Sequence, residues 1–164
     1  MTHNRSHSLR RATGQALWLA ALLLALVGAL RPAAVRAATI NVAAAEVAVS
    51  DNGVCSLREA INNANDTTDG QNDTPGHDDC AAGDPAGADT INLAAGTYTL
   101  TDSFAAYSGA TALPQITSPI TIEGNGATID RSGGNVFRLL AVSSAGNLTL
   151  NDLTLTDGAM NSDV

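Results

Sequence analysis

Short stretches of alternating apolar and polar residues begin near Asp89 and recur along the chain. Ile91 and Leu93 alternate with polar neighbours, and the same alternation returns from Ile120 and again from Leu148. The interval is 29 residues from Ile91 to Ile120 and 28 residues from Ile120 to Leu148. Alternation with a period of two is typical of strands with one buried face, and a near-constant repeat is typical of stacked coils.

These features predict an all-β fold, namely a right-handed parallel β-helix of about three coils with a short N-terminal capping helix. Turns at 94–96, 124–126 and 151–152 separate the strands, and residues 137–139 add another strand. Residues 102–115 are expected to form a loop that leaves one coil. A β-sandwich is the alternative, but it accounts neither for the repeat nor for the helix before the strands.

The capping helix is predicted over residues 55–65, just before the strands. Apolar residues recur at the spacing of one helix face, at Leu57, Ala60, Ile61 and Ala64. Ser56 and Glu59 match the capping box, in which each side chain bonds the backbone amide of the other residue. Because so short a helix is not stable alone, we expect Leu57 and Ile61 to plug the end of the strand core.

Residues 1–37 have the pattern of a cleavable export signal, which leaves residues 38–164 as the folded part. The opening segment is basic, and the apolar run over residues 16–30 is shorter than a membrane-spanning helix. Cleavage is predicted after Ala37, with the position after Ala38 as the alternative, and an uncleaved membrane anchor is the other interpretation. The folded part is therefore expected in the cell envelope, at the outer-membrane surface or outside the cell, with membrane contact only through the signal.

The charge of the chain changes sign at the same boundary. The sequence has no lysine, and five of its arginines precede Ala38, whereas all 16 acidic residues follow it. So acidic a folded part repels phosphate backbones, and nucleic-acid binding is not expected. The expected partner is a polysaccharide or a protein outside the cell or at its surface.

Cys55 and Cys80 are the only cysteines, and an even count in an exported chain favours a disulfide. Five aspartates in or beside the enclosed loop are weak candidates for metal ligands: Asp66, Asp69, Asp73, Asp78 and Asp79. Their oxygens suit calcium, but their spacing is not that of an EF-hand, so a solvated insertion is favoured over a calcium site. His77 lies in this loop without a partnered nucleophile and is not assigned a catalytic role.

Several blocks of the chain, taken in order, resemble the CSLREA domain family. The most specific is Cys-Ser-Leu-Arg-Glu-Ala-Ile at residues 55–61. The other blocks lie at residues 39–42, 51–54, 88–91, 95–98, 113–116, 120–131 and 137–140. The resemblance implies the N-terminal region of a large secreted or surface β-helix protein of bacteria, similar in architecture to pectin lyases and chlamydial polymorphic outer-membrane proteins. It also implies further coils, so we expect this chain to be a fragment of a longer polypeptide.

The expected function is a structural or adhesive surface module without enzymatic activity. Analogy of fold leaves a polysaccharide-binding or polysaccharide-cleaving, lyase-like protein as the alternative. Charged residues in or beside the coils would carry that chemistry: Glu123, Asp130, Asp152, Arg131 and Arg138. A calcium-binding module built on the acidic loop at residues 66–84 is the third interpretation.

Overall fold

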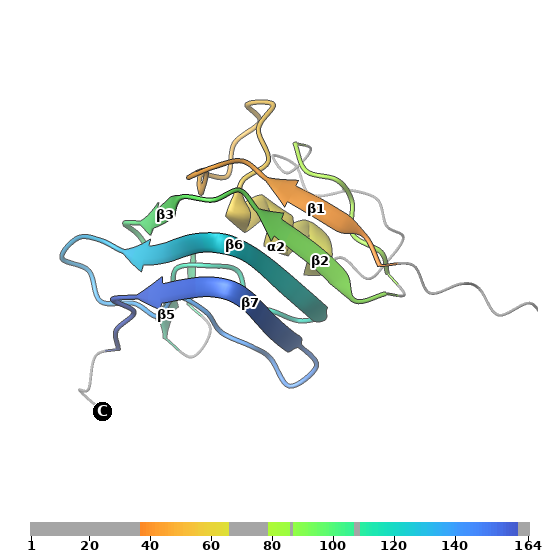
Figure 1. The fold of residues 1–164 in the computed structure, drawn as a ribbon. Helices are drawn as coiled ribbons and strands as arrows, with labels where there is room; N and C mark the ends of the chain where they lie inside the picture. Colours follow the sequence, from red (N-terminus) through yellow and green to blue (C-terminus); the bar gives the residue numbers. More distant parts are fainter. Residues whose placement is uncertain (1–36, 66–78, 86, 107–108, 161–164) are drawn as a thin grey trace, which may run out of the picture. The chain divides into compact units, whose positions relative to one another are not determined.

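The computed structural model describes residues 37–65, 79–85, 87–106 and 109–160, and these residues form mostly strands. The strands are β1 (Thr39–Val42), β2 (Asp89–Leu93), β3 (Thr97–Leu100), β4 (Ala105–Ala106), β5 (Ala110–Thr111), β6 (Pro119–Arg131) and β7 (Asn147–Thr156). A single helix, α2 (Leu57–Asn65), occurs within the described ranges (Figure 1). The predicted export signal lies outside them, apart from Ala37. Over the same ranges no helix has the length and apolar character needed to cross a membrane.

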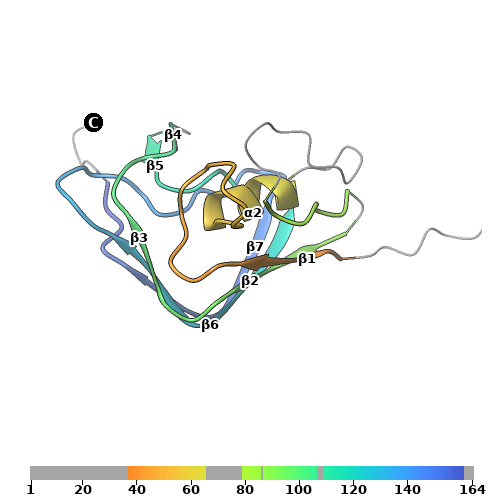
Figure 2. The ribbon, with the colours of Figure 1, turned by 90° about the horizontal axis from the view of Figure 1, so that it is seen from above.

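The main sheet has five strands and is curled. β2 pairs with the first half of β6 and β3 with its second half, while β1 lies beyond β2 and β7 runs along β6. The sheet bends near the middle of β6, which gives it the form of a half-barrel (Figure 2). All four strand pairs in this sheet are parallel, which is not the antiparallel pairing that the β-sandwich alternative requires.

The alternating pattern places the apolar residues of the strands on the concave face of the sheet. Ile40, Ile91 and Ile122 are register partners on β1, β2 and β6, and each is fully buried. The residues that follow them point to the outer face, where Asn92 Nδ2 donates to Asn41 Oδ1 at 3.0 Å. Branched side chains within the core and polar pairs outside it are the arrangement expected of a sheet with one buried face.

The register between β2 and β6 differs from the one that the sequence predicts. Ile91 pairs with Ile122, 31 residues later, and Ile120 pairs instead with Asp89. Strand side chains repeat every two residues, so a shift of two leaves the same face buried, and alternation alone does not distinguish the two registers. The second predicted interval is confirmed, because Ile120 pairs with Leu148.

β6 continues through residues 124–126, where the sequence predicts a turn between strands. Asn125 and Gly126 have φ values of 51° and 78°, so the backbone bends there without ending the strand. The β6–β7 register shifts at this bend. The backbones of β6 and β7 approach closely at Gly124, where a Cβ atom would overlap the carbonyl oxygen of Asp152 on β7. This position therefore requires glycine.

The segment between β3 and β6 is not the simple loop predicted for residues 102–115. It contains the short antiparallel pair β4–β5 and then buries Leu113 and Ile116 completely. The Leu113 amide donates to the Leu139 carbonyl at 3.2 Å, and the Ile116 amide donates to the Ala141 carbonyl at 2.9 Å. The β-bridges from Thr111 to Arg138 and from Ile116 to Val142 are parallel, so the chain runs in the same direction through both stretches.

Candidate functional site: a helical cap and its disulfide

Helix α2 lies on the concave side of the curled sheet, against β1, β2 and β6 (Figure 2). Leu57 and Ile61 are fully buried, and Ala60 and Ala64 lie on the same covered face. Burial of one large aliphatic side chain contributes about 1.5–3 kcal/mol, which is how tertiary packing stabilises a helix too short to persist alone.

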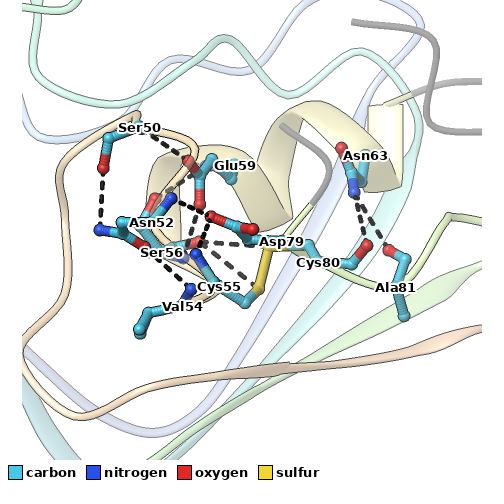
Figure 3. Close-up of a disulfide and its surroundings, with 11 residues drawn as sticks. Ser50, Asn52, Val54, Cys55, Ser56, Glu59, Asn63, Asp79, Cys80 and Ala81 are labelled. Atoms are coloured by element: carbon cyan, nitrogen blue, oxygen red, sulfur yellow. Dashed lines mark hydrogen bonds between the residues drawn. A yellow bond between two sulfur atoms is a disulfide. The ribbon is translucent and has the colours of Figure 1, made fainter. Parts of the chain in front are cut away.

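The first turn of α2 is held by Ser56 and Glu59, whose side chains are both fully buried. The Glu59 amide donates to Ser56 Oγ at 3.3 Å, and the Ser56 amide donates to Glu59 Oε2 at 2.9 Å. Glu59 Oε1 accepts a further hydrogen bond from the Ser50 amide at 2.8 Å (Figure 3). The carboxylate therefore satisfies amides at the helix start and also fixes the loop that leads into the helix.

Arg58, at the fourth position of the block 55–61, contributes contacts that sequence reasoning did not assign. Its Nε donates to the Ala112 carbonyl at 3.0 Å. Its Nη2 donates to both the carbonyl oxygen and the carboxylate of Asp102, each at 3.0 Å. The guanidinium carbon also lies 5.5 Å from the centroid of the Phe104 ring. The buried arginine thus joins the helix to the chain around β4 and β5.

The last turn of α2 makes a second set of contacts with the same region. Asn65 Nδ2 donates to the Gln115 carbonyl at 2.7 Å, and Asn65 Oδ1 accepts from the Thr117 amide at 2.8 Å. Ser118 Oγ donates to the Ala64 carbonyl at 2.7 Å. Both ends of the helix are therefore bonded to a segment some fifty residues further along the chain.

The segment over residues 112–117 thus lies between two different partners. On one side its backbone bonds to the backbone of residues 138–141, as one strand bonds to another. On the other side the bonds come from side chains of α2. Backbone groups at the edge of a sheet need partners, and here helix side chains take the place of a neighbouring strand.

The predicted disulfide between Cys55 and Cys80 is confirmed, with the two Cα atoms 4.6 Å apart. It links the residue before the α2 cap to the segment 79–85, which follows the acidic loop in sequence (Figure 3). Asn63 Nδ2 lies within hydrogen-bond reach of the Cys80 and Ala81 carbonyls, at 3.4 Å and 3.2 Å. A disulfide at this place indicates an environment outside the cytoplasm.

Of the five aspartates considered for calcium, the structure describes only Asp79, and the other four lie outside the described residues. Asp79 Oδ2 accepts hydrogen bonds from the amides of Asn52 and Gly53 at 2.8 Å and 2.9 Å (Figure 3). The carboxylate therefore holds the turn before Cys55. Within the described residues, no group of three or more histidine, cysteine, aspartate or glutamate side chains is placed to bind a metal ion.

Glu123 and Arg131, two of the charged residues considered for polysaccharide cleavage, make contacts along strands and turns. Glu123 Oε1 accepts from Asn151 Nδ2 at 2.8 Å on the outer face of the sheet. Arg131 Nε donates to the Asp157 carbonyl at 2.5 Å, and its Nη1 donates to the Asn135 carbonyl at 2.7 Å. These contacts join neighbouring strands and turns, which is a structural use of both side chains.

Asp89, at the start of β2, is a further buried group that sequence reasoning did not single out, because it occupies an ordinary strand-start position. It is only 1% exposed. Its Oδ1 accepts from the Ala38 amide at 2.9 Å, and its two oxygens accept from the Asp84 amide at 3.2 Å and 3.1 Å. Burial raises the pKa of the Asp89 carboxyl and the negative charge of Asp84 adds to this rise, whereas the two amides lower the pKa.

Together, the fold and the site define a class: an all-β protein with a curled parallel sheet, whose concave side is occupied by a disulfide-linked helix. Comparison with protein-family models, with curated proteins and with solved structures finds no match.

Replacing Arg58 with methionine is expected to lower the free energy of unfolding by about 2 kcal/mol, because two carbonyl groups lose a charged donor while the aliphatic stem is retained. Urea unfolding followed by circular dichroism measures this loss. Asp102→Ala is the matched control, since it removes only the carboxylate of an ion pair in which the Asp102 side chain is 64% exposed. That control should lose less than about 1 kcal/mol, and equal losses in the two variants would contradict the assigned role of the carbonyl contacts.

Proposed function

We propose that residues 38–164 form the N-terminal cap and first coils of a right-handed parallel β-helix of CSLREA type, in an exported surface or secreted protein. Residues 1–37 act as the export signal and are removed after Ala37. The function of this region is structural or adhesive, namely to start and seal a rigid scaffold that presents loops to partners outside the cell. The observation that carries the proposal is the bonding of α2 side chains to the backbone edge at residues 112–117.

The path of the chain supports the β-helix. One pass runs along β2, then β3, then residues 111–116, and the next runs along the two halves of β6 and then residues 137–142. β7 follows β6 through both halves, and the Ala159 amide then donates to the Phe137 carbonyl at 3.0 Å. Successive passes that repeat three parallel segments in the same order are what a β-helix requires.

The two ends of the stack differ in how they are covered, which supports a cap at the β1 side. On the β1 side, helix α2 packs against β1 and β2 and bonds to residues 112–118, whereas β7 leaves Leu150 and Leu155 exposed by 36% and 42%. A shallow groove beside β7 is lined by Arg138, Leu139, Leu155, Gly158 and Met160. Alternating leucines along an edge strand provide a surface on which another coil of the same kind stacks.

The export part of the proposal is tested by producing the whole chain with its own N-terminus in a bacterium. We expect intact-mass measurement of the product to show loss of residues 1–37 and an intact disulfide, and cell fractionation to place the product outside the cytoplasm. A Leu24→Arg variant, which interrupts the apolar run, serves as the control and should remain uncleaved inside the cell. Retention of residues 1–37 with free thiols in the wild-type product would overturn the export proposal.

A further inference from the structure

The buried carboxylate of Asp89 has an unusual set of neighbours. Its described hydrogen bonds come from the backbone amides of Ala38 and Asp84, and the charged group that influences its pKa is the acidic side chain of Asp84. A buried carboxylate is normally paired with a positive charge, because amide donors only partly offset the loss of water. The position of Ala38 indicates where such a charge would arise.

The strand pairing holds the Ala38 nitrogen beside this carboxylate. The Thr90 amide donates to the Ala38 carbonyl at 2.8 Å, and Thr39 and Thr90 are register partners in β1 and β2. Gly83 allows the neighbouring segment to close over the same carboxylate, because a Cβ atom there would lie 2.7 Å from Asp89 Oδ2. The contact with Ala38 therefore follows from the β1–β2 pairing.

We propose that cleavage after Ala37 turns the Ala38 nitrogen into an α-ammonium group that forms an ion pair with Asp89 and fastens β1 to β2. This inference rests on the proposed export signal. Hydrolysis of the bond between Ala37 and Ala38 consumes one water, leaves a carboxylate on Ala37 and leaves an amine on Ala38. The amine takes up a proton at neutral pH, so that a full positive charge replaces the amide donor now 2.9 Å from Asp89 Oδ1.

The two predicted cleavage positions would place the new α-amino group on different residues. A cut after Ala38 would place the new amino group on Thr39, one residue further into β1, and would remove the nitrogen that contacts Asp89. A cut after Ala37 keeps that nitrogen and gives it two additional protons to donate. Charge-assisted hydrogen bonds are stronger than neutral ones, so this cut strengthens the contact between the start of β1 and Asp89.

The absence of lysine allows a direct test, because the α-amino group is then the single primary amine of the chain. We would treat the exported, processed protein with a limiting amount of an N-hydroxysuccinimide acetate ester and follow acetylation by intact mass. An ion pair with Asp89 raises the pKa of the α-ammonium group above its usual value of about 8. We therefore expect acetylation at about pH 8 to be at least about tenfold slower in the native wild type than in Asp89→Asn or in the urea-unfolded chain.

Asp51→Asn provides the matched control, since it removes one negative charge from an exposed residue and should react as slowly as the wild type. If Asp89→Asn does not fold, the test is the pH dependence of the acetylation rate in the native wild type. A midpoint near pH 8, about the usual pKa of an α-ammonium group, overturns the ion pair. An Ala38 N-terminus with equal rates in wild type and Asp89→Asn overturns the ion pair but leaves the export signal in place. A processed protein that begins at a residue other than Ala38 overturns the proposed cleavage after Ala37, and the ion pair with it.

Discussion

A Leu57→Asp variant is expected to accumulate as unfolded or aggregated chain instead of soluble folded protein. Leu57 is fully buried between α2 and the concave face of the sheet. Removing a buried leucine side chain costs about 2–5 kcal/mol, and burying an unpaired carboxylate costs several more. The total is comparable with the 5–15 kcal/mol that stabilises an ordinary domain, so the variant should lose its folded state.

The measurement is the soluble yield of the exported chain, followed by thermal unfolding of whatever remains soluble. Val136→Asp makes a similar aliphatic-to-acid change at a position that is 38% exposed, and it should melt within a few degrees of the wild type. Wild-type solubility and melting in Leu57→Asp would show that α2 does not plug the core. Loss of folding in both variants would mean that an added aspartate destabilises the chain wherever it is placed. The effect of Leu57→Asp would then not be specific to the helix.

The helix and its cap could be predicted because their interactions are local. Ser56 and Glu59 are three residues apart, and the apolar face of α2 follows directly from the spacing of its residues. Arg58 and Asn65 could not be assigned in the same way, because their partners lie 54 and 50 residues further along the chain. A sequence shows that such side chains can bond to a backbone, but not which backbone segment the fold brings to them.

The strands show the same division between local and distant information. Alternation correctly predicts which face of β2 and β6 is buried, yet it leaves the register open by two residues, and the structure pairs Ile91 with Ile122. The sequence predicts a loop over residues 102–115, which contain Gly109 and Pro114. Burial of Leu113 and the neighbouring Ile116 depends on contacts with residues 138–142, which local pattern does not indicate.

The disulfide is expected to contribute about 3 kcal/mol to the stability of the cap. Cys55 and Cys80 are 25 residues apart, and closing a loop of this size restricts the unfolded chain by about that amount in the chain-entropy model. The bond also acts beside two other contacts of the same segment, from Asp79 to the turn before Cys55 and from Asn63 to the Cys80 carbonyl. Its loss should therefore loosen the 79–85 segment before it loosens the sheet.

The double variant Cys55→Ala/Cys80→Ala tests this order. Its urea midpoint should fall by the equivalent of about 3 kcal/mol, and hydrogen exchange should become fastest at the amides of Asn52 and Gly53, while the amides of β6 remain protected. Asp79→Asn is the matched control: it weakens the contact with the turn but keeps the covalent link, and it should cost less than about 1.5 kcal/mol. Equal midpoints for the double variant and the wild type would show that α2 is held by packing and by its bonds to residues 112–118 without help from the disulfide.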